Sequence, residues 1–221
     1  MLRPLLICLL CVLGTGSAPP VSAEAVIGPV TRPVARTEAL PRMAWERQAG
    51  STLWTRSALS ALSGHAQALV DSTPRDIGDW CPAYPQADAA QRRAFWVGLL
   101  SVLARFESTH RADAVGGGGL YHGLLQILPA TAEGHGCHAR TGPALRNGAA
   151  NLSCALRIMA RTVPRDGVIA AQEGRWRGVA ADWGPMRVAE RRAGMQNWLK
   201  QQSYCRPLSS VRPKARPSGQ E

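Results

Sequence analysis

An apolar stripe with helical spacing, between Asp88 and Phe106, constrains the fold more than any other feature of this sequence. Apolar side chains recur there every three or four residues. They are Phe95, Leu99, Val102 and Phe106, and the stripe is widened by Trp96, Leu100 and Leu103. The pattern predicts a long, largely buried helix with Asp88 as its N-cap. Such a helix needs a core around it, and 221 residues of which 45% are hydrophobic are enough to provide one.

Three further segments have helical patterns, at around 53–71, 145–163 and 186–202, and the second of these is the strongest. In the second of them Leu152, Leu156, Met159 and Val163 keep the helical period, and Pro164 predicts its end. The segment 109–143 is rich in glycine and is expected to form only short helical or hairpin pieces. No segment alternates with period two over five or more residues, so the predicted fold class is mainly α.

The two ends of the chain differ in composition from its middle. Residues 1–23 have a positive start at Arg3, an apolar run at 5–13 and small residues at 21–23, as in a secretory signal peptide. The apolar run is too short to span a membrane as an anchor. Residues 24–50 and 206–221 contain scattered prolines, and we expect both to be extended or disordered. The predicted folded domain is therefore 51–205.

Four cysteines remain after a signal peptide is removed, an even number in an oxidising compartment. Two disulfides can pair in three ways. We favour Cys137–Cys154, which closes a short loop, and Cys81–Cys205, which ties together the two ends of the folded region. The competing interpretation, in which His135, Cys137 and His138 bind a metal, lacks a second cluster with zinc-site spacing.

The chain has a strong positive charge, +11 overall and +10 over the 198 residues that follow a signal peptide. Such a charge favours nucleic acid, an anionic membrane surface or an anionic polymer such as a cell wall as partner. Export makes nucleic acid the least suitable of the three.

Glu107 directly follows the apolar stripe, so it lies at the C-terminal end of the predicted helix. The negative end of the helix dipole and the neighbouring aromatic side chains would both raise the pKa of its carboxyl group. A carboxyl group that stays protonated near neutral pH suits general-acid cleavage of a glycosidic bond. The alternative is an exposed glutamate that merely closes a helix.

Glu107-Ser108 is followed by a Gly-rich stretch after Asp113 and by Gly-Leu-Leu-Gln-Ile-Leu-Pro-Ala-Thr-Ala at 123–132. This combination resembles the lytic transglycosylases of the soluble-lytic-transglycosylase type, which have a lysozyme-like fold. The resemblance is good over about 91–163 and weaker to about 204. Asn151 resembles the asparagine that opens the family's next helix.

This resemblance implies a lysozyme-like helical domain with an irregular, Gly-rich loop region in the substrate groove. It implies cleavage of the β-1,4 bond between N-acetylmuramic acid and N-acetylglucosamine, with Glu107 as acid and then base and 1,6-anhydro ends as products. No metal or organic cofactor is expected. The implied substrate-binding residues are Ser108, Tyr121, Gly123, Leu124, Gln126, Asp182 and Trp183, whereas Asp113 is expected to be a turn residue.

The sequence departs from the family where a tyrosine is expected to point at the acid, because Asp182 or Trp183 stands there. Asp182 near Glu107 would raise the pKa of the acid by like-charge repulsion, or would act as a second carboxylate. Two alternatives to a transglycosylase stay open. One is a lysozyme-type hydrolase, and the other is a peptidoglycan-binding accessory protein without turnover.

The expected partner is peptidoglycan, with no nucleic acid and no stable membrane insertion. The expected location is the periplasm or the exterior of the cell, and the expected state is a monomer. General wall remodelling and local gap opening for a secretion or conjugation complex both fit such an enzyme.

Overall fold

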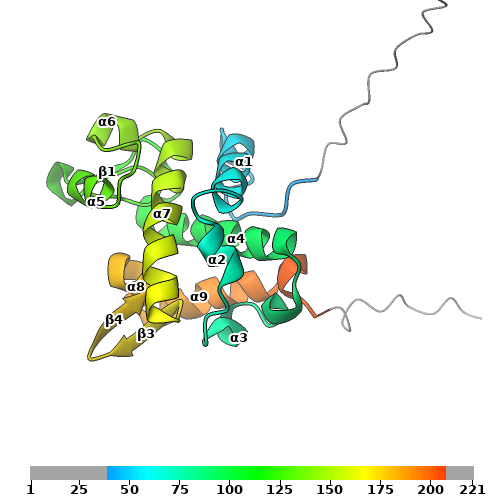
Figure 1. The fold of residues 1–221 in the computed structure, drawn as a ribbon. Helices are drawn as coiled ribbons and strands as arrows, with labels where there is room; N and C mark the ends of the chain where they lie inside the picture. The colour runs from blue at the N-terminus through cyan, green and yellow to red at the C-terminus, as the bar shows by residue number, and fades with distance from the viewer. Residues whose placement is uncertain (1–38, 208–221) are drawn as a thin grey trace, which may run out of the picture. The chain divides into compact units, whose positions relative to one another are not determined.

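The computed structural model describes residues 39–207, which fold as one compact unit of mainly α class (Figure 1). The predicted signal peptide and most of the predicted basic tail lie outside the described residues. The elements in chain order are α1 Ser51–Leu62, α2 Gln67–Asp71, α3 Ile77–Trp80, the 3₁₀ turn η1 Tyr84–Gln86, α4 Ala89–Ser108, β1 Val115–Gly116, η2 Gly117–Gly119, β2 Tyr121–His122, α5 Pro129–Gly134, α6 Gly142–Leu145, α7 Gly148–Asp166, β3 Ala170–Glu173, β4 Arg175–Gly178, α8 Val179–Asp182, η3 Gly184–Arg187, α9 Ala189–Lys200 and η4 Ser203–Cys205.

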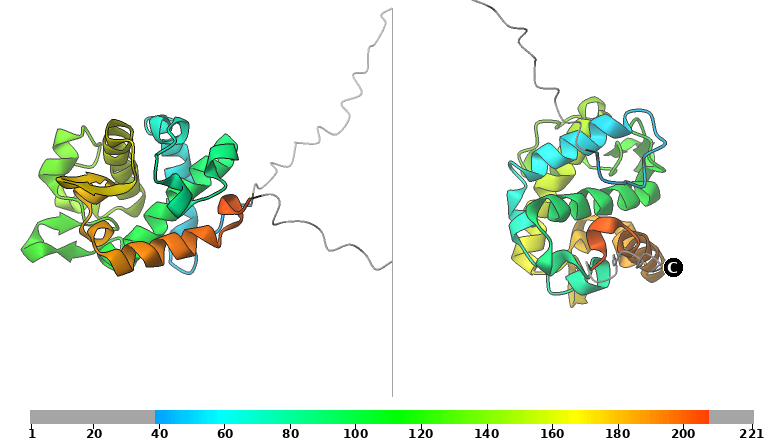
Figure 2. Two further views of the ribbon diagram at one scale, coloured as in Figure 1. Left: turned by 90° about the horizontal axis from the view of Figure 1, so that it is seen from below. Right: turned by 90° about the vertical axis from the view of Figure 1, so that its right-hand side faces the viewer.

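Helix α4 is the central element, and the predicted helix at 88–106 is confirmed. Its N-terminus has a capping box, in which the Asp88 carboxylate accepts from the Gln91 backbone N–H and the Gln91 side chain accepts from the Asp88 N–H. Helix α1 lies on one side of α4 and α9 on the other, while α7 packs on α1 and α2 (Figures 1 and 2). Gly98 permits the close approach of the C-terminal turn η4, because a Cβ there would lie 2.4 Å from the Tyr204 hydroxyl oxygen.

Residues 39–50 belong to the folded unit, so the domain boundary predicted at 51 is too late. Met43 and Trp45 are buried in the core. The Ala44 backbone N–H donates to Ser101 Oγ on α4 at 3.0 Å, and the Trp45 indole N–H donates to Thr55 Oγ1 on α1 at 3.0 Å. These contacts anchor the N-terminal segment across both helices.

Helix α7 departs from the prediction in its position and its end. It runs to Asp166, so Pro164 lies inside the helix rather than ending it. Pro164 has no N–H to donate to the carbonyl oxygen four residues earlier, and the helix ends two residues later, where Gly167 adopts a left-handed conformation with φ of 66°. At its start Asn147 is the N-cap, so Asn151 does not open the helix but lies one turn inside it. The segment predicted as one helix at 53–71 is divided into α1 and α2.

Two short antiparallel hairpins complete the fold. One is β1–β2 in the Gly-rich segment, where hairpin pieces were predicted, and the other is β3–β4. The second was not predicted, because its four-residue strands are shorter than the alternation needed to recognise them.

Both disulfides have the pairing favoured from the sequence. Cys81–Cys205 joins the end of α3 to η4, and Cys137–Cys154 joins the loop after α5 to α7. Because the sulfur of Cys137 is bonded to Cys154, it is not free to act as a metal ligand beside His135 and His138. Within residues 39–207 no helix has the length and apolar character needed to cross a membrane.

Candidate active site

Glu107 lies in the last turn of α4 and is partly buried. Burial raises the pKa of its carboxyl group to about 7, and the guanidinium group of Arg191 on α9 acts in the opposite direction. The same guanidinium group lies 5.9 Å from the centre of the Phe106 ring. Among the described residues, no carboxylate contributes to the raised pKa of Glu107. Burial is therefore its cause, rather than the like-charge repulsion from Asp182 considered above.

The end of α4 is held by hydrogen bonds on both sides of the glutamate. Ser108 Oγ donates to the Ala104 carbonyl oxygen at 3.2 Å and to the Leu124 carbonyl oxygen at 2.9 Å. Thr109 and His110 then take left-handed conformations with φ of 53° and 63°, which end the helix abruptly. Ser108 is buried, so its role is to fix the helix end to the loop that follows rather than to face a substrate.

The Gly-Leu-Leu-Gln segment at 123–126 is held in place by Asn151. The Leu125 backbone N–H donates to Asn151 Oδ1 at 2.9 Å, and Asn151 Nδ2 donates to the carbonyl oxygens of His122 and Leu145, each at 2.9 Å. Asn151 is fully buried, and all three bonds are to backbone groups. One side chain on α7 therefore fixes the backbone of the segment that follows β2.

Gly123 and Leu124 are both constrained by packing within the fold. Leu124 is completely buried in the core. A Cβ at Gly123 would lie 2.1 Å from the Leu145 carbonyl oxygen and 2.4 Å from Asn151 Nδ2, and its φ is +80°. Glycine is thus required by the packing of this loop on α6 and α7.

The remaining predicted residues meet around one cavity of about 230 Å³. Tyr121, Gln126, Asp182 and Trp183 all line it, together with Thr131 and Ile158. Gln126 has φ of 45°, and its side chain donates to the carbonyl oxygens of Ala114 and Gly123. The Trp183 indole N–H donates to the Leu125 carbonyl oxygen at 3.0 Å, so this largely buried ring supports the segment from below.

Asp182 lies at the end of α8, and its pKa is raised. The residue as a whole is exposed, but burial of the carboxyl group is the largest cause of the shift. His135, Arg165 and Arg187 act in the opposite direction, as does a hydrogen bond from Thr162. These groups belong to α7 and its neighbours, and Glu107 is not among the groups that act on Asp182. Asp113, in contrast, is exposed in a turn, as predicted.

One contributor to the site, Arg191, was missed in the sequence, and another, Asn151, was assigned a different role. Arg191 gave no signal, because one arginine among 26 basic residues is distinguished only by the packing of α9 against α4. Asn151 was interpreted as the start of a helix. Its position on the buried face of a predicted helix could have indicated its role, because a buried asparagine side chain needs hydrogen-bond partners inside the protein.

A mainly helical domain whose central helix ends in a partly buried glutamate beside a Gly-rich loop defines the lysozyme-like class. No protein-family model and no curated protein matches the chain. It is similar to solved structures of the Bdellovibrio protein DslA, a wild-type form and a variant with one glutamate changed to glutamine, each with 31% sequence identity and a TM-score of 0.69. A second such variant has 30% identity and the same TM-score.

Each alignment covers 76% of this chain and 100% of the DslA chain. At this identity and coverage, the chain belongs to the same family as DslA.

Proposed function

We propose that this protein is a peptidoglycan lytic transglycosylase, which cleaves the β-1,4 bond between N-acetylmuramic acid and N-acetylglucosamine. The observation that supports this most directly is Glu107. Its carboxyl group has a pKa of about 7 through burial, lies on a fixed helix end, and has no carboxylate among the groups that shift it. It is therefore half protonated near neutral pH, as a group that acts first as an acid and then as a base requires.

The mechanism uses Glu107 and groups of the substrate. Protonated Glu107 donates its proton to the glycosidic oxygen as the bond from that oxygen to the anomeric carbon breaks. The carbonyl oxygen of the substrate's own acetamido group attacks the anomeric carbon and replaces a protein nucleophile. The Glu107 carboxylate then takes the proton of the sugar 6-hydroxyl group. That oxygen closes a 1,6-anhydro ring and displaces the acetamido oxygen, and Glu107 is protonated again.

The distribution of glutamates in the chain favours a single acid. Glu107 is the only glutamate between Glu46 and Glu133. In DslA the two glutamates changed to glutamine are eleven positions apart. No two glutamates of this chain have that spacing, and the position eleven residues after Glu107 is Gly118. A mechanism assisted by the substrate needs no second glutamate, whereas a hydrolase with two carboxylates needs another acidic side chain beside Glu107.

The cavity lined by Tyr121, Gln126 and Asp182 suits a sugar ring of the substrate. It combines the aromatic face of Tyr121 with the polar ends of Gln126, Thr131 and Asp182. Its volume of about 230 Å³ is below the usual range for drug-sized ligands, which fits one sugar unit of a longer chain lying in a groove. In this proposal Trp183 and Ser108 position the loop rather than contact the substrate.

The proposed location is the periplasm or the exterior of the cell, where disulfides such as those seen here persist. The proposed partner is peptidoglycan, with the protein acting as a monomer in wall remodelling or in gap opening for a secretion or conjugation complex. The positive charge of the chain favours binding to an anionic wall polymer.

Digestion of purified peptidoglycan followed by mass spectrometry of the products tests this proposal. Anhydro ends are expected, and Glu107→Gln is expected to abolish them. Glu133→Gln is the matched control, because Glu133 is an exposed glutamate on α5. Reducing ends would show a lysozyme-type hydrolase instead, and binding without any product would show an accessory protein.

A further inference from the structure

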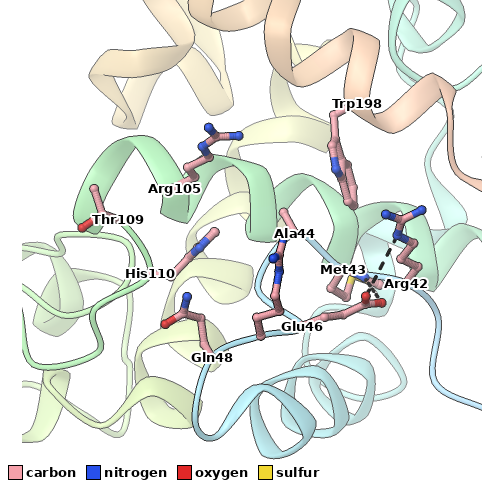
Figure 3. Close-up of a pocket in the computed structure, with 10 residues that line it drawn as sticks. Arg42, Met43, Ala44, Glu46, Gln48, Arg105, Thr109, His110 and Trp198 are labelled. Atoms are coloured by element: carbon pink, nitrogen blue, oxygen red, sulfur yellow. Dashed lines mark hydrogen bonds and ion pairs between the residues drawn. The ribbon is translucent and has the colours of Figure 1, made fainter.

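A second and larger cavity, of about 530 Å³, lies between the N-terminal segment and the C-terminal half of α4. Figure 3 shows Arg42 and Gln48 on the N-terminal segment, Arg105, Thr109 and His110 at the end of α4, and Trp198 reaching in from α9. We name this cavity the arginine groove, after Arg42, Arg47 and Arg105 in its lining. Neither Glu107 nor any residue that lines the cavity of about 230 Å³ is among them.

The positive charge of the groove is largely uncompensated. Glu46 is its one carboxylate, and it is occupied by the Met43 backbone N–H at 3.1 Å and by Arg42 at 4.0 Å. Within residues 39–207, the guanidinium groups of Arg47 and Arg105 have no hydrogen bond and no ion pair. Each presents planar N–H donors that match a carboxylate. The groove therefore has two guanidinium groups available to an anionic ligand, and its one carboxylate is already paired.

The walls of the groove are fixed before any ligand binds. One wall contains two consecutive residues in left-handed conformations, Thr109 and His110. Such conformations persist only where the surrounding structure holds the backbone in place. His110 is buried, with Nε2 2.8 Å from the Ser101 carbonyl oxygen, and the Trp198 ring covers the opposite side. A ligand would thus meet a fixed backbone wall and an aromatic face, while the exposed side chains of Arg47 and Arg105 can turn toward it.

The groove continues toward the catalytic end of α4. A smaller cavity of about 200 Å³ shares Arg105 and Trp198 with it and extends to Phe106. Phe106 precedes Glu107 and lies under Arg191, the cation that acts on Glu107. Glu107 lies about 200° around α4 from Arg105, so the acid and the groove are on opposite faces of the last helical turn. A substituent on a strand at Glu107 would reach the groove by passing around this helix end, along Phe106 and the smaller cavity.

We propose that the arginine groove binds the carboxylates of the short peptides attached to the glycan, and so selects peptide-bearing strands. This inference rests on the proposed function, and it names a subsite for the peptide rather than for the sugar. An acidic peptide supplies what the groove lacks, namely carboxylates for Arg47 and Arg105, with short apolar side chains against Trp198 and Met43.

The test compares two substrates and three variants. The substrates are peptidoglycan strands with their peptides and the same strands after enzymatic removal of the peptides. The variants are Arg47→Gln, the double variant Arg47→Gln with Arg105→Gln, and Arg56→Gln as a control with an exposed arginine on α1 outside the groove. For the double variant, KM on peptide-bearing strands is expected to rise about fivefold with kcat unchanged, because exposed charge pairs contribute modestly. KM on stripped strands is expected to stay constant.

Because the single variant Arg47→Gln leaves α4 untouched, a smaller rise in its KM on peptide-bearing strands shows that helix damage is not the cause. Equal KM values for wild type and double variant on peptide-bearing strands would overturn the groove assignment while leaving glycan cleavage established.

If the wild-type protein cleaves neither substrate, the proposed function fails, and binding decides the groove separately. In that experiment a synthetic tetrapeptide with two free carboxylates is titrated into Glu107→Gln. Saturable binding that weakens about fivefold in the Arg47→Gln, Arg105→Gln background supports the groove. Binding that does not change in that background refutes it.

Discussion

Replacing Glu107 by glutamine should stabilise this protein at alkaline pH while removing its activity. The folded state raises the pKa of this carboxyl group from 4.5 to about 7 through burial, against the opposing charge of Arg191. Because the pKa is higher in the folded state, the folded protein binds the proton more tightly than the unfolded chain does. Stability is then fully present below pH 4.5 and is lost as the pH rises through 7.

The size of this loss follows from the same two values. A tenfold change in proton affinity corresponds to ~1.4 kcal/mol, so a pKa rise from 4.5 to about 7 corresponds to ~3 kcal/mol lost between pH 4 and pH 8. Glutamine is nearly the same size and has no proton to lose. The free energy of unfolding of Glu107→Gln minus that of the wild type is therefore expected to grow by ~3 kcal/mol across this range.

Urea unfolding followed by tryptophan fluorescence, with both disulfides intact, measures this difference at pH 4, 6 and 8. The result is the change with pH in the difference between the two free energies of unfolding. Any effect of the glutamine amide that does not depend on pH therefore cancels. Glu133→Gln, on the exposed side of α5, is the control and should follow the wild type at every pH. A Glu107→Gln difference that stays constant within ~1 kcal/mol would refute a buried, proton-holding carboxyl at this position.

Three further substitutions test other parts of the site. Arg191→Gln removes the charge that lowers the pKa of Glu107, so the alkaline limb of the pH–rate profile should move to higher pH, while Arg56→Gln leaves it unchanged. Asn151→Ala removes three hydrogen bonds to backbone groups, of which only the His122 carbonyl oxygen keeps a second partner, the Ile127 N–H. It should cost ~3 kcal/mol in urea unfolding, against ~1 kcal/mol for the helix cap in Asn147→Ala. Asp182→Asn should keep most of the wild-type rate on peptidoglycan, because Asp182 does not act on the pKa of Glu107; a loss greater than about 100-fold would place it in the mechanism.

The parts of the fold that could be predicted are those with a long local pattern. The apolar period from Phe95 to Phe106 was enough to find α4, because twenty helical residues repeat one face many times. The disulfide pairing followed from an even cysteine count and simple loop arguments. Glu107 was found as the polar residue that directly ends the apolar stripe.

The parts that could not be predicted depend on contacts between distant segments. Met43 and Trp45 have no periodic neighbours, and their burial depends on the space between α1 and α4. The β3–β4 hairpin is linked to the rest of the fold by Asp166, whose buried carboxylate accepts from the Gly178 backbone N–H and pairs with Arg165. The spacing of residues in the sequence does not show that Asp166 on α7 binds the backbone of β4. The hairpin could therefore not be predicted from its own residues.

The last turn of α4 connects the two candidate binding regions. On one side it carries Glu107, and on the other Arg105 and the left-handed pair that closes the arginine groove. The turn is also fixed to the loop of the sugar cavity through Ser108 and Leu124. A peptide held in the groove adds binding energy to the whole strand without contacting Glu107. Loss of that binding energy affects the bound substrate and the transition state equally, which is why the arginine variants are expected to raise KM on peptide-bearing strands and to leave kcat unchanged.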